Sequence, residues 1–336
     1  MYPLRFEPIF RRYIWGGQRL ATVLNKPIGS ESCAESWEIV DHNEDQSIVT
    51  AGPLRGKSLG DLIREHGSEL LGSSAYARIT ASDVPQQLNG RFPLLLKFLD
   101  ANRSLSVQVH PDDSMGATLN PPDFGKTEAW YVMHADSGAK IYAGLKQGVT
   151  QAQFRDAIEQ GETEALLHSF EPTAGDCVFI RAGTLHAIGE GLLIAEIQQA
   201  SDTTFRVFDW NRVDKDGKPR DLHIEESLAA TDFELGPVNP VAAKDTEFSN
   251  ATEIVSSEKF VMRRWQCDQP IVINDNKMHI IAVTKGSAQI ANDPGDQPLS
   301  LGNTALIPAA CSQTTITPQQ PAEILDIYLP YRKKAA

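Results

Sequence analysis

The chain has 336 residues, of which 41% are hydrophobic and 22% charged, so it can bury the cores of two ordinary domains without disulfides. Its formal net charge of −13 repels a phosphate backbone and an anionic bilayer surface, so neither nucleic acid nor a membrane is an expected partner. No apolar run is long enough to span a bilayer, no signal peptide is recognisable at the start, and the four cysteines have no Cys-x-x-Cys spacing. We therefore expect a soluble cytoplasmic protein with reduced thiols.

Two segments have the start signals of helices. Ser58 and Asp61 have the spacing of a capping box in front of an apolar stripe, and Thr150 and Gln153 repeat that spacing. A further apolar pair, Leu70-Leu71, follows the first segment in a stretch that is compatible with either a loop or a helix. Helices are expected near 58–66, 151–160 and 163–168.

The rest of the chain has a β-rich pattern, in which short apolar runs alternate with Gly and Pro. Segment 235–247 contains two prolines that block regular structure, and it is predicted to be a linker between domains. The residues after it predict a sandwich or jelly roll, with Lys285-Gly286 as one of the turns. Strands are expected there at Phe260–Trp265, His279–Thr284, Ser287–Ile290, Ala305–Ile307 and Ile324–Tyr328.

A weak internal repeat relates the two halves. Gly175 to His186 follows the pattern G-x5-R-x-G-x2-H, and Gly302 to Gln313 follows G-x5-P-x-A-x2-Q. In each copy the Gly opens a turn, a strand follows, and a second turn presents the last residue. One copy ends in a potential metal ligand and the other in Gln, so the repeat predicts one working site and one structural copy. Chance similarity of two Gly-punctuated strands is the alternative.

Strict alternation of apolar and polar residues runs from Leu105 to His110. In a strand this places Ser106, Gln108 and His110 on one face, about 6.5 Å apart along the strand. This face is either an ordinary solvated surface or a row of ligands.

Further polar side chains occupy similar strand positions. Lys126 and Glu128 share a face of the next expected strand, and His186 lies at the tip of the repeat turn. Each alone is compatible with an ordinary surface or core residue. Together with His110 and Gln108, the two histidines and one carboxylate suit zinc, and also iron, manganese, nickel or cobalt, with positions left open for water or substrate.

The segment after Ile194 carries a third group of polar residues. Glu196 and Gln198 share one face of an expected strand, and Asp202 and Arg206 bracket the entry to the next one. A structural salt bridge between Asp202 and Arg206 is one interpretation. The other is that the guanidinium lies near a metal and stabilises negative charge that develops on oxygen.

In this order, the stretches resemble the type I mannose-6-phosphate isomerases (phosphomannose isomerases) in their short bacterial form, which belong to the cupin superfamily. The resemblance runs nearly from end to end. The matching motifs are Ile14-Trp15-Gly16-Gly17, Glu35-Ser36-Trp37-Glu38, Pro93 to Asp100, Leu105 to Asp113, Gly125-Lys126-Thr127-Glu128-Ala129-Trp130, Gly183 to Ala187, and Glu196 through Trp210-Asn211-Arg212.

The resemblance implies a mainly β fold with two cupin (jelly-roll) β-barrel domains. Residues 1–237 would form a catalytic, metal-binding cupin domain with helical insertions near 58–80 and 150–168. Residues 245–332 would form a degenerate cupin domain without metal ligands. The expected state is a monomer or a weak homodimer in the cytoplasm.

The activity that the resemblance implies is a metal-dependent aldose–ketose isomerisation. D-mannose 6-phosphate and D-fructose 6-phosphate would interconvert by proton transfer through a cis-enediol, with one Zn²⁺ per chain or another divalent ion such as Co²⁺, and a sugar phosphate as the small-molecule partner. A non-catalytic sugar-phosphate cupin and an oxygen-using iron cupin are the alternatives.

The family's site residues carry over to positions of this chain. The proton carrier is left open between Glu196, Lys126 and a metal-bound water. The implied metal ligands are His110, Glu128, His186 and Gln108; the implied catalytic residues are Arg206, Glu196 and Lys126; the implied substrate-binding residues are Lys97, Ser106, Asp202 and Trp15.

Overall fold

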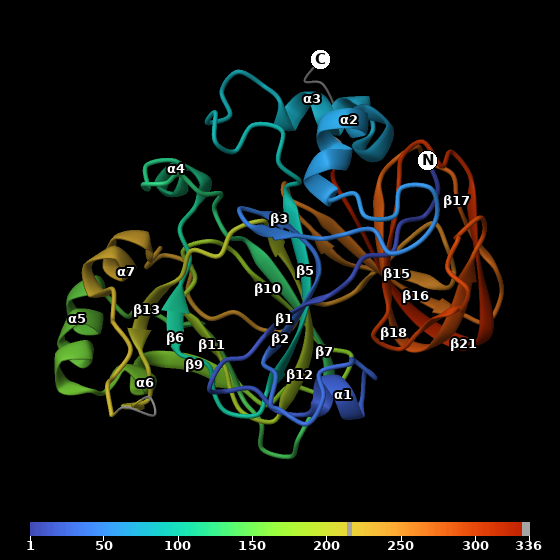
Figure 1. Ribbon diagram of the computed structural model, residues 1–336. Helices are drawn as coiled ribbons and strands as arrows, with labels where there is room; N and C mark the ends of the chain where they lie inside the picture. The colour runs from blue at the N-terminus through green and yellow to red at the C-terminus, as the bar shows by residue number, and fades with distance from the viewer. Residues whose placement is uncertain (214–216, 331–336) are drawn as a thin grey trace.

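The computed structural model describes residues 1–213 and 217–330. Its main elements are antiparallel sheets of six, five and eight strands, with short helices around the first two (Figure 1). A two-stranded ribbon pairs β3 (Asp41–His42) with β4 (Asp45–Gln46). None of the helices in the described ranges is both long and apolar enough to cross a membrane.

Two sheets make up the N-terminal part. The six-stranded sheet contains, in spatial order, β1 (Ile9–Arg11), β2 (Glu35–Ile39), β5 (Leu94–Ala101), β12 (Leu192–Gln199), β7 (Glu128–Ala135) and β10 (Cys177–Ile180). The five-stranded sheet contains β13 (Phe205–Phe208), β6 (Val107–Val109), β11 (His186–Ile188), β8 (Ile141–Leu145) and β9 (Leu167–Phe170). Both sheets are open paths with two edge strands, and the mainly β prediction is confirmed.

The six-stranded sheet is buried on both faces. Trp130 and Val132 point to one face of β7 and pack, together with Ile141 of β8, in a core between the two sheets. Ala129 and Tyr131 alternate to the other face, where they join a core that includes residues of the C-terminal sheet. This explains why all eight residues of β5 and of β12 are buried, since a sheet that is covered on both sides no longer alternates apolar with polar residues.

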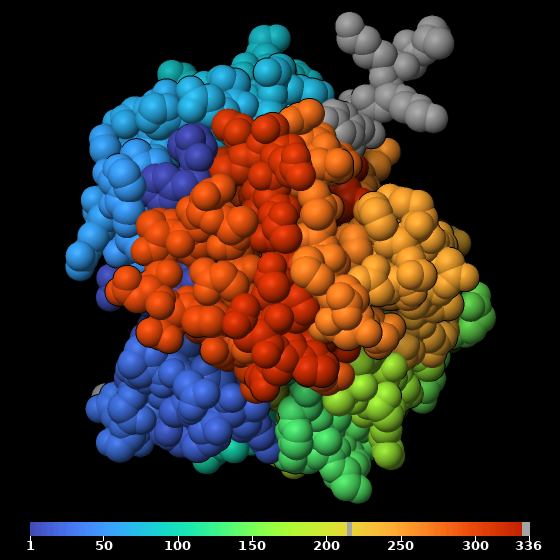
Figure 2. Space-filling model, turned by 90° about the vertical axis from the view of Figure 1, so that its right-hand side faces the viewer, coloured from blue at the N-terminus to red at the C-terminus, as the bar shows by residue number. Residues whose placement is uncertain are grey.

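The C-terminal sheet is built entirely from strands that follow residue 243, and it has a core of its own. Its strands are β14 (Lys244–Asp245), β15 (Ala251–Ser256), β16 (Val261–Cys267), β17 (Ile271–Ile273), β18 (His279–Ile290), β19 (Leu299–Ser300), β20 (Thr304–Ile307) and β21 (Thr314–Tyr328). Figure 2 shows these strands, in orange and red, across one face of the molecule, with N-terminal residues in blue beside them.

The N-terminal part is also tied to this sheet by backbone hydrogen bonds. The amide of Leu4 donates to the carbonyl of Leu306 at 2.8 Å, and the amide of Leu306 donates back at 2.9 Å. The amide of Ala309 donates to Leu70 at 2.9 Å. The second copy of the repeat therefore packs against the start of the chain and a helix of the first half, and its Gln313 is exposed.

The helices follow the local signals closely. In α2 (Leu59–Leu71), Ser58 and Asp61 form the predicted capping box, and the helix extends past the predicted end to include Leu70 and Leu71. In α5 (Gln151–Gln160) the second capping box is present and both predicted ends are correct. The other helices are α1 (Arg19–Thr22), α3 (Ser73–Ile79), α4 (Asp113–Gly116), α6 (Thr163–Leu166) and α7 (Ile224–Ala230).

Two local predictions were wrong. The helix expected at 163–168 ends at Leu166, because Leu167 pairs with Leu145 and begins β9. Lys285-Gly286 is not a turn, because β18 runs through it as one strand against β21. The pairing shifts register on either side of Lys285, and Gly286 has φ 69°, so the glycine forms a bulge within a long strand.

The predicted linker 235–247 is irregular as far as residue 243, and its last residues include β14. It is anchored by amides of Val238 and Val241, which donate to Ala143 and Cys177 respectively. At the other end of the predicted C-terminal domain, residues 331–332 lie outside the described residues.

Candidate metal centre and active-site cavity

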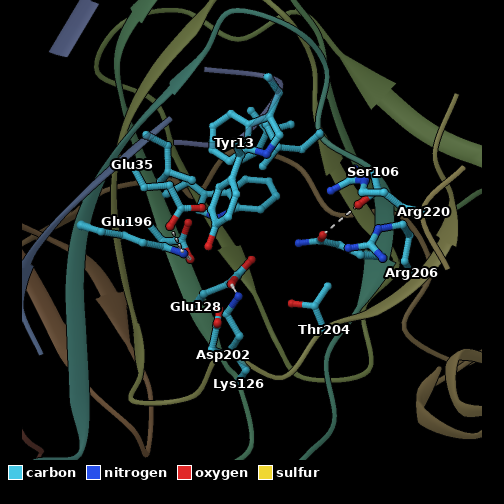
Figure 3. Close-up of a pocket in the computed structure, with 17 residues that line it drawn as sticks. Tyr13, Glu35, Ser106, Lys126, Glu128, Glu196, Asp202, Thr204, Arg206 and Arg220 are labelled. Atoms are coloured by element: carbon cyan, nitrogen blue, oxygen red, sulfur yellow. Dashed lines mark hydrogen bonds and ion pairs between the residues drawn. The ribbon is translucent and has the colours of Figure 1, made fainter. Parts of the chain in front are cut away.

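A cavity of about 270 Å³ opens between the six-stranded and five-stranded sheets. Figure 3 shows Glu35 and Glu196 on one side of it and Ser106, Arg206 and Arg220 on the other. Nine of the eleven residues that the resemblance singles out line it, and the remaining two, His110 and His186, lie against Glu128. The lining comprises Tyr13, Trp15, Glu35, Lys97, Leu99, Leu105, Ser106, Gln108, Lys126, Glu128, Trp130, Ile188, Glu196, Asp202, Thr204, Arg206 and Arg220.

Strand register creates one wall. In the five-stranded sheet Gln108 of β6 is the direct partner of Arg206 on β13 and of His186 on β11. Side chains that are directly opposite on antiparallel strands point to the same face, so these three form a row. Ser106 and His110 flank Gln108 in the alternation and are both buried, so this face of the strand is not the solvated surface of the alternative interpretation.

The opposite wall is a second row, on the six-stranded sheet. Glu196 of β12 is the direct partner of Lys97 on β5 and of Trp130 on β7. Glu128 begins β7, two residues before Trp130, and therefore faces the same side. The two rows bring cationic, anionic and amide groups into one buried space.

Two histidines and a glutamate converge where the walls meet. His110 Nε2 lies 3.4 Å from Glu128 Oε2, and His186 Nε2 lies 3.4 Å from Glu128 Oε1. The potential ligand atoms of the three residues all lie within 4.8 Å of one another, and all three side chains are buried. In the described residues Glu128 Oε2 has no hydrogen-bond partner. The Lys126 ammonium lies 3.4 Å from it, beyond ordinary hydrogen-bonding distance, so this buried carboxylate oxygen can still accept a closer cation.

The backbone orients both imidazoles. His110 Nδ1 lies 3.0 Å from the Thr203 carbonyl, and His186 Nδ1 lies 2.8 Å from the Thr184 carbonyl. A proton on Nδ1 leaves the lone pair on Nε2, which faces Glu128. Burial lowers the pKa of His186 to about 4 and lowers that of His110 well below its ordinary value, so both rings are neutral near pH 7, as a metal requires.

Gln108 brings an amide to the same point. Its Nε2 lies 3.5 Å from His110 Nε2 and 3.3 Å from His186 Nε2. The amide donates to these lone pairs in this arrangement, and a half-turn about the last side-chain bond presents the oxygen instead. With that turn, the four side chains fit a divalent ion of the zinc type.

Lys97 and Glu196 lie beside the candidate metal ligands. Lys97 Nζ is 3.6 Å from Glu196 Oε1 and 3.4 Å from Glu35 Oε2. Burial lowers the pKa of Lys97, but the surrounding carboxylates outweigh it and raise the pKa overall, so this amine stays protonated. Burial raises the pKa of Glu196 to about 8, against the attraction of Lys97 and with the repulsion of Glu128.

Lys126 forms an ion pair with Glu128, the glutamate among the candidate metal ligands. Its Nζ lies 3.4 Å from Glu128 Oε2, and the side chain is buried. Asp202 lies on the same side of the cavity, where burial raises the pKa of its carboxyl against the attraction of Lys97 and Lys126. Trp15 is buried in the lining and contacts Tyr13, with ring centroids 5.8 Å apart.

The arginine side of the cavity carries excess positive charge. Arg220 donates through Nε to Asp209 at 2.8 Å, and Arg212 pairs with the same carboxylate. Arg206 donates to the Asp221 carbonyl at 2.9 Å, and not to Asp202 as the salt-bridge interpretation requires. Burial and the neighbouring Arg220 lower the pKa of Arg206. Two guanidinium groups therefore share the carboxylate of Asp209, and the third, Arg206, donates to a backbone carbonyl.

Four polar residues of the cavity were missed by the sequence interpretation: Tyr13, Glu35, Thr204 and Arg220. Glu35 begins the motif Glu35-Ser36-Trp37-Glu38, and Tyr13 is two residues from Trp15. Their positions next to family motifs could therefore have marked both as candidate cavity residues. Arg220 had no such signal, because it lies in an irregular segment between β13 and α7.

Comparisons with known proteins agree with this geometry. Residues 4–125 match the model of the phosphomannose isomerase type I catalytic domain. The chain is 37% identical to the mannose-6-phosphate isomerase of Streptococcus mutans, over 90% of this chain and 93% of that protein. It is 32% identical to the probable mannose-6-phosphate isomerase GmuF of Bacillus subtilis, over 94% and 96% of the two chains.

The fold leads to the same group of proteins. The crystal structure of the mannose 6-phosphate isomerase from Bacillus subtilis superimposes with a TM-score of 0.86 at 29% identity, over 98% of this chain and 100% of that one. Phosphomannose isomerase from Salmonella typhimurium, at 16% identity and a TM-score of 0.76, shares the fold. With end-to-end relatives above 30% identity, the chain belongs to the type I mannose-6-phosphate isomerase family.

Proposed function

We propose that the chain is a metal-dependent aldose–ketose isomerase that interconverts D-mannose 6-phosphate and D-fructose 6-phosphate. The observation that carries the proposal is the buried His110–Glu128–His186 group beside a cavity with carboxylates on one side and arginines on the other. The reaction is proposed from membership of the family. The cavity contains groups suited to metal binding, to proton transfer and to phosphate binding.

One divalent ion per chain, with Zn²⁺ as the proposed metal and Co²⁺ as a substitute, would be held by His110, Glu128, His186 and Gln108. When bound, it supplies Lewis-acid stabilisation of negative charge on the sugar oxygens. The fit rests on neutral, preoriented imidazoles and on the carboxylate oxygen of Glu128 that has no hydrogen-bond partner in the described residues.

Proton transfer between C1 and C2 needs a group whose protonation changes near neutral pH. Glu196 is the best match, because burial raises its pKa to about 8 and its Oε1 is buried without a hydrogen bond in the described residues. Lys97 stays protonated and, in this proposal, holds Glu196 in place and stabilises its ionised form. Lys126, close to Glu128, is the second choice for the proton carrier.

The phosphate needs mobile or uncompensated positive charge. Lys97 and Lys126 are each engaged by carboxylates. On the other side of the cavity, with Ser106, Arg206 donates to a backbone carbonyl and Arg220 shares the Asp209 carboxylate with Arg212. We therefore place the phosphate at Arg220 and Ser106, with Arg206 between it and the candidate metal ligands, where a guanidinium can stabilise the enediolate without losing its proton. Trp15 and Asp202 would contact the sugar.

The domain division is part of the proposal. The separate core of the C-terminal sheet supports two units, a catalytic unit of residues 1–237 and a second unit of residues 245–332 without metal ligands, both of the cupin type. We also propose that the protein is a monomer or a weak homodimer and that it is located in the cytoplasm.

A coupled assay tests the proposal. Purified protein is stripped with a chelator, reloaded with Zn²⁺, Co²⁺, Mn²⁺ or Fe²⁺, and supplied with a panel of sugar phosphates. Formation of fructose 6-phosphate from mannose 6-phosphate, with free mannose turned over far more slowly, is the expected result. A protein that binds the sugar phosphate without turnover under any metal contradicts the proposal, and so does oxygen consumption with Fe²⁺.

A further inference from the structure

Residues 201–204 join β12 to β13 and lie directly beside the proposed metal site. Asp202 and Thr204 line the cavity, and between them the carbonyl of Thr203 lies 3.0 Å from His110 Nδ1. Because the orientation of the His110 ring depends on this carbonyl, the position of the segment determines where His110 Nε2 points.

Asp123 lies beneath this segment, in the irregular chain before β7. Its Oδ2 accepts hydrogen bonds from the hydroxyls of Ser201 and Thr203, both at 2.8 Å. Its Oδ1 accepts the amide of Phe124 at 2.9 Å and lies 3.5 Å from His42 Nε2. The side chain is buried, and each oxygen is used as an acceptor.

The geometry points to Asp123 as a positioning residue, which holds residues 201–204 so that the Thr203 carbonyl orients His110 for metal binding. This inference rests on the proposed metal site and assigns a role to a residue that belongs neither to the cavity lining nor to the three candidate ligands.

The contacts explain how the single carboxylate of Asp123 can fix the position of residues 201–204. Ser201 and Thr203 lie on either side of Asp202, so two hydroxyls on a single oxygen clamp the segment at both ends of that residue. The Ser201 carbonyl also accepts a hydrogen bond from Gln198 Nε2 at 2.6 Å. Thr203 then has its hydroxyl committed to Asp123 and its carbonyl to His110, which leaves it little freedom to rotate.

The charge state of Asp123 agrees with this role. Burial raises the pKa of its carboxyl, but hydrogen bonds from His42, Ser201 and Thr203 outweigh burial and lower the pKa overall. The group is therefore an ionised acceptor at neutral pH, and charge-assisted hydrogen bonds of this kind are stronger than neutral ones.

Asp123→Asn tests the role with little change in volume. An amide cannot accept on both of its ends, so either the two hydroxyls or the Phe124 amide loses its acceptor. We expect the affinity for Zn²⁺ and Co²⁺, measured by chelator competition, to fall roughly 10- to 100-fold, as for other residues that orient a metal-binding histidine. The visible spectrum of the Co²⁺-loaded variant should also change, because the ligand field of His110 changes.

Asp176→Asn is the matched control. Asp176 accepts the amide and hydroxyl of Thr173 at 2.7 and 3.1 Å, in a turn that contributes nothing to the cavity lining. The Asp176→Asn variant should keep the metal affinity and the Co²⁺ spectrum of the wild type. Thr203→Val is the second variant: it keeps the carbonyl but loses the hydroxyl, and it should reproduce the effects of Asp123→Asn even if that protein folds poorly.

The outcomes separate the two proposals. If the wild-type chain binds no divalent ion, the metal site itself is wrong. If the wild type binds metal tightly and both Asp123→Asn and Thr203→Val retain its affinity and Co²⁺ spectrum, the positioning role is overturned. A lower melting temperature in either variant with unchanged affinity also overturns it, because Asp123 would then only stabilise the fold.

Discussion

Lys97 and Glu196 are direct partners on neighbouring antiparallel strands, with Lys97 Nζ 3.6 Å from Glu196 Oε1 in a fully buried position. This pairing keeps an ammonium beside a carboxyl whose pKa is raised to about 8 by burial. The Glu196 carboxyl can therefore lose and regain a proton near neutral pH while Lys97 keeps its positive charge.

Glu196→Gln should lower kcat roughly 10²- to 10⁴-fold and change KM by only a few-fold, because the amide keeps the shape but cannot carry the proton. Steady-state kinetics on mannose 6-phosphate measure this, with the exposed Glu159→Gln of α5 as the control. A kcat close to that of the wild type would transfer the role to Lys126.

The pH profile gives a separate test of Glu196. A base must be ionised, so kcat/KM should rise with pH through the pKa of this group. Burial raises that pKa from 4.5 to about 8, and a dication beside Glu128 lowers it again. We expect the acid limb in the metal-loaded enzyme to lie between these values and to disappear in Glu196→Gln. If the acid limb of the kcat/KM profile is unchanged in Glu196→Gln, the titration belongs to another group.

Arg220→Ala should raise KM for the sugar phosphate by roughly tenfold or more and leave kcat within a few-fold, since a phosphate contact binds ground state and transition state alike. Inhibition by inorganic phosphate should weaken in parallel. Arg155→Ala, which removes an exposed pair with Glu225, is the control. An unchanged KM would place the phosphate elsewhere in the cavity.

Arg206→Ala should have the opposite signature. Its proposed contact is with negative charge that develops during the reaction, so kcat should fall by roughly 10²-fold or more with a smaller change in KM. Arg206→Lys should restore only part of the rate, because an ammonium lacks the planar pair of donors. A change confined to KM would make Arg206 a substrate-binding group like Arg220.

The helices show how far local signals reach. The bounds of α5 could be predicted because Thr150 and Gln153 lie at its start and a glycine, Gly161, ends it. The end of α6 could not, because Leu167 leaves the helix to pair with Leu145, a contact that depends on the folded sheet. Similarly, Gly286 has the positive φ of a turn residue but forms a bulge, because β21 continues opposite it.

The same distinction holds for the cavity. His110 and Glu128 could be singled out because strand alternation and known motifs mark their positions. Arg220 and Asp123 could not, because both lie in irregular segments, which loop connections and long-range hydrogen bonds bring to the site. Residues that orient or supplement a site from loops leave no periodic pattern in the sequence.

The C-terminal sheet offers a prediction about stability. His279 is buried between two carboxylates, with Nδ1 2.6 Å from Asp326 Oδ1 and Nε2 2.9 Å from Asp275 Oδ1. Lys277 also pairs with Asp275, and the Tyr328 ring lies 5.2 Å from the imidazole. Burial lowers the pKa of His279, but the two carboxylates outweigh it and raise the pKa to about 9.

A pKa that is higher in the folded chain than in the unfolded one stabilises the fold below the unfolded value of 6.5, and this contribution is lost as pH rises towards about 9. The imidazolium of His279 thus contributes up to about 3 kcal/mol to the free energy of unfolding below pH 6.5. His279→Gln should be destabilised most at pH 6, and its difference from the wild type in urea unfolding should shrink towards pH 9. His168→Gln is the control, because this half-buried histidine lies against an amide, Asn239, and not against carboxylates. A constant difference for His279→Gln across this range would mean that His279 does not carry the charge.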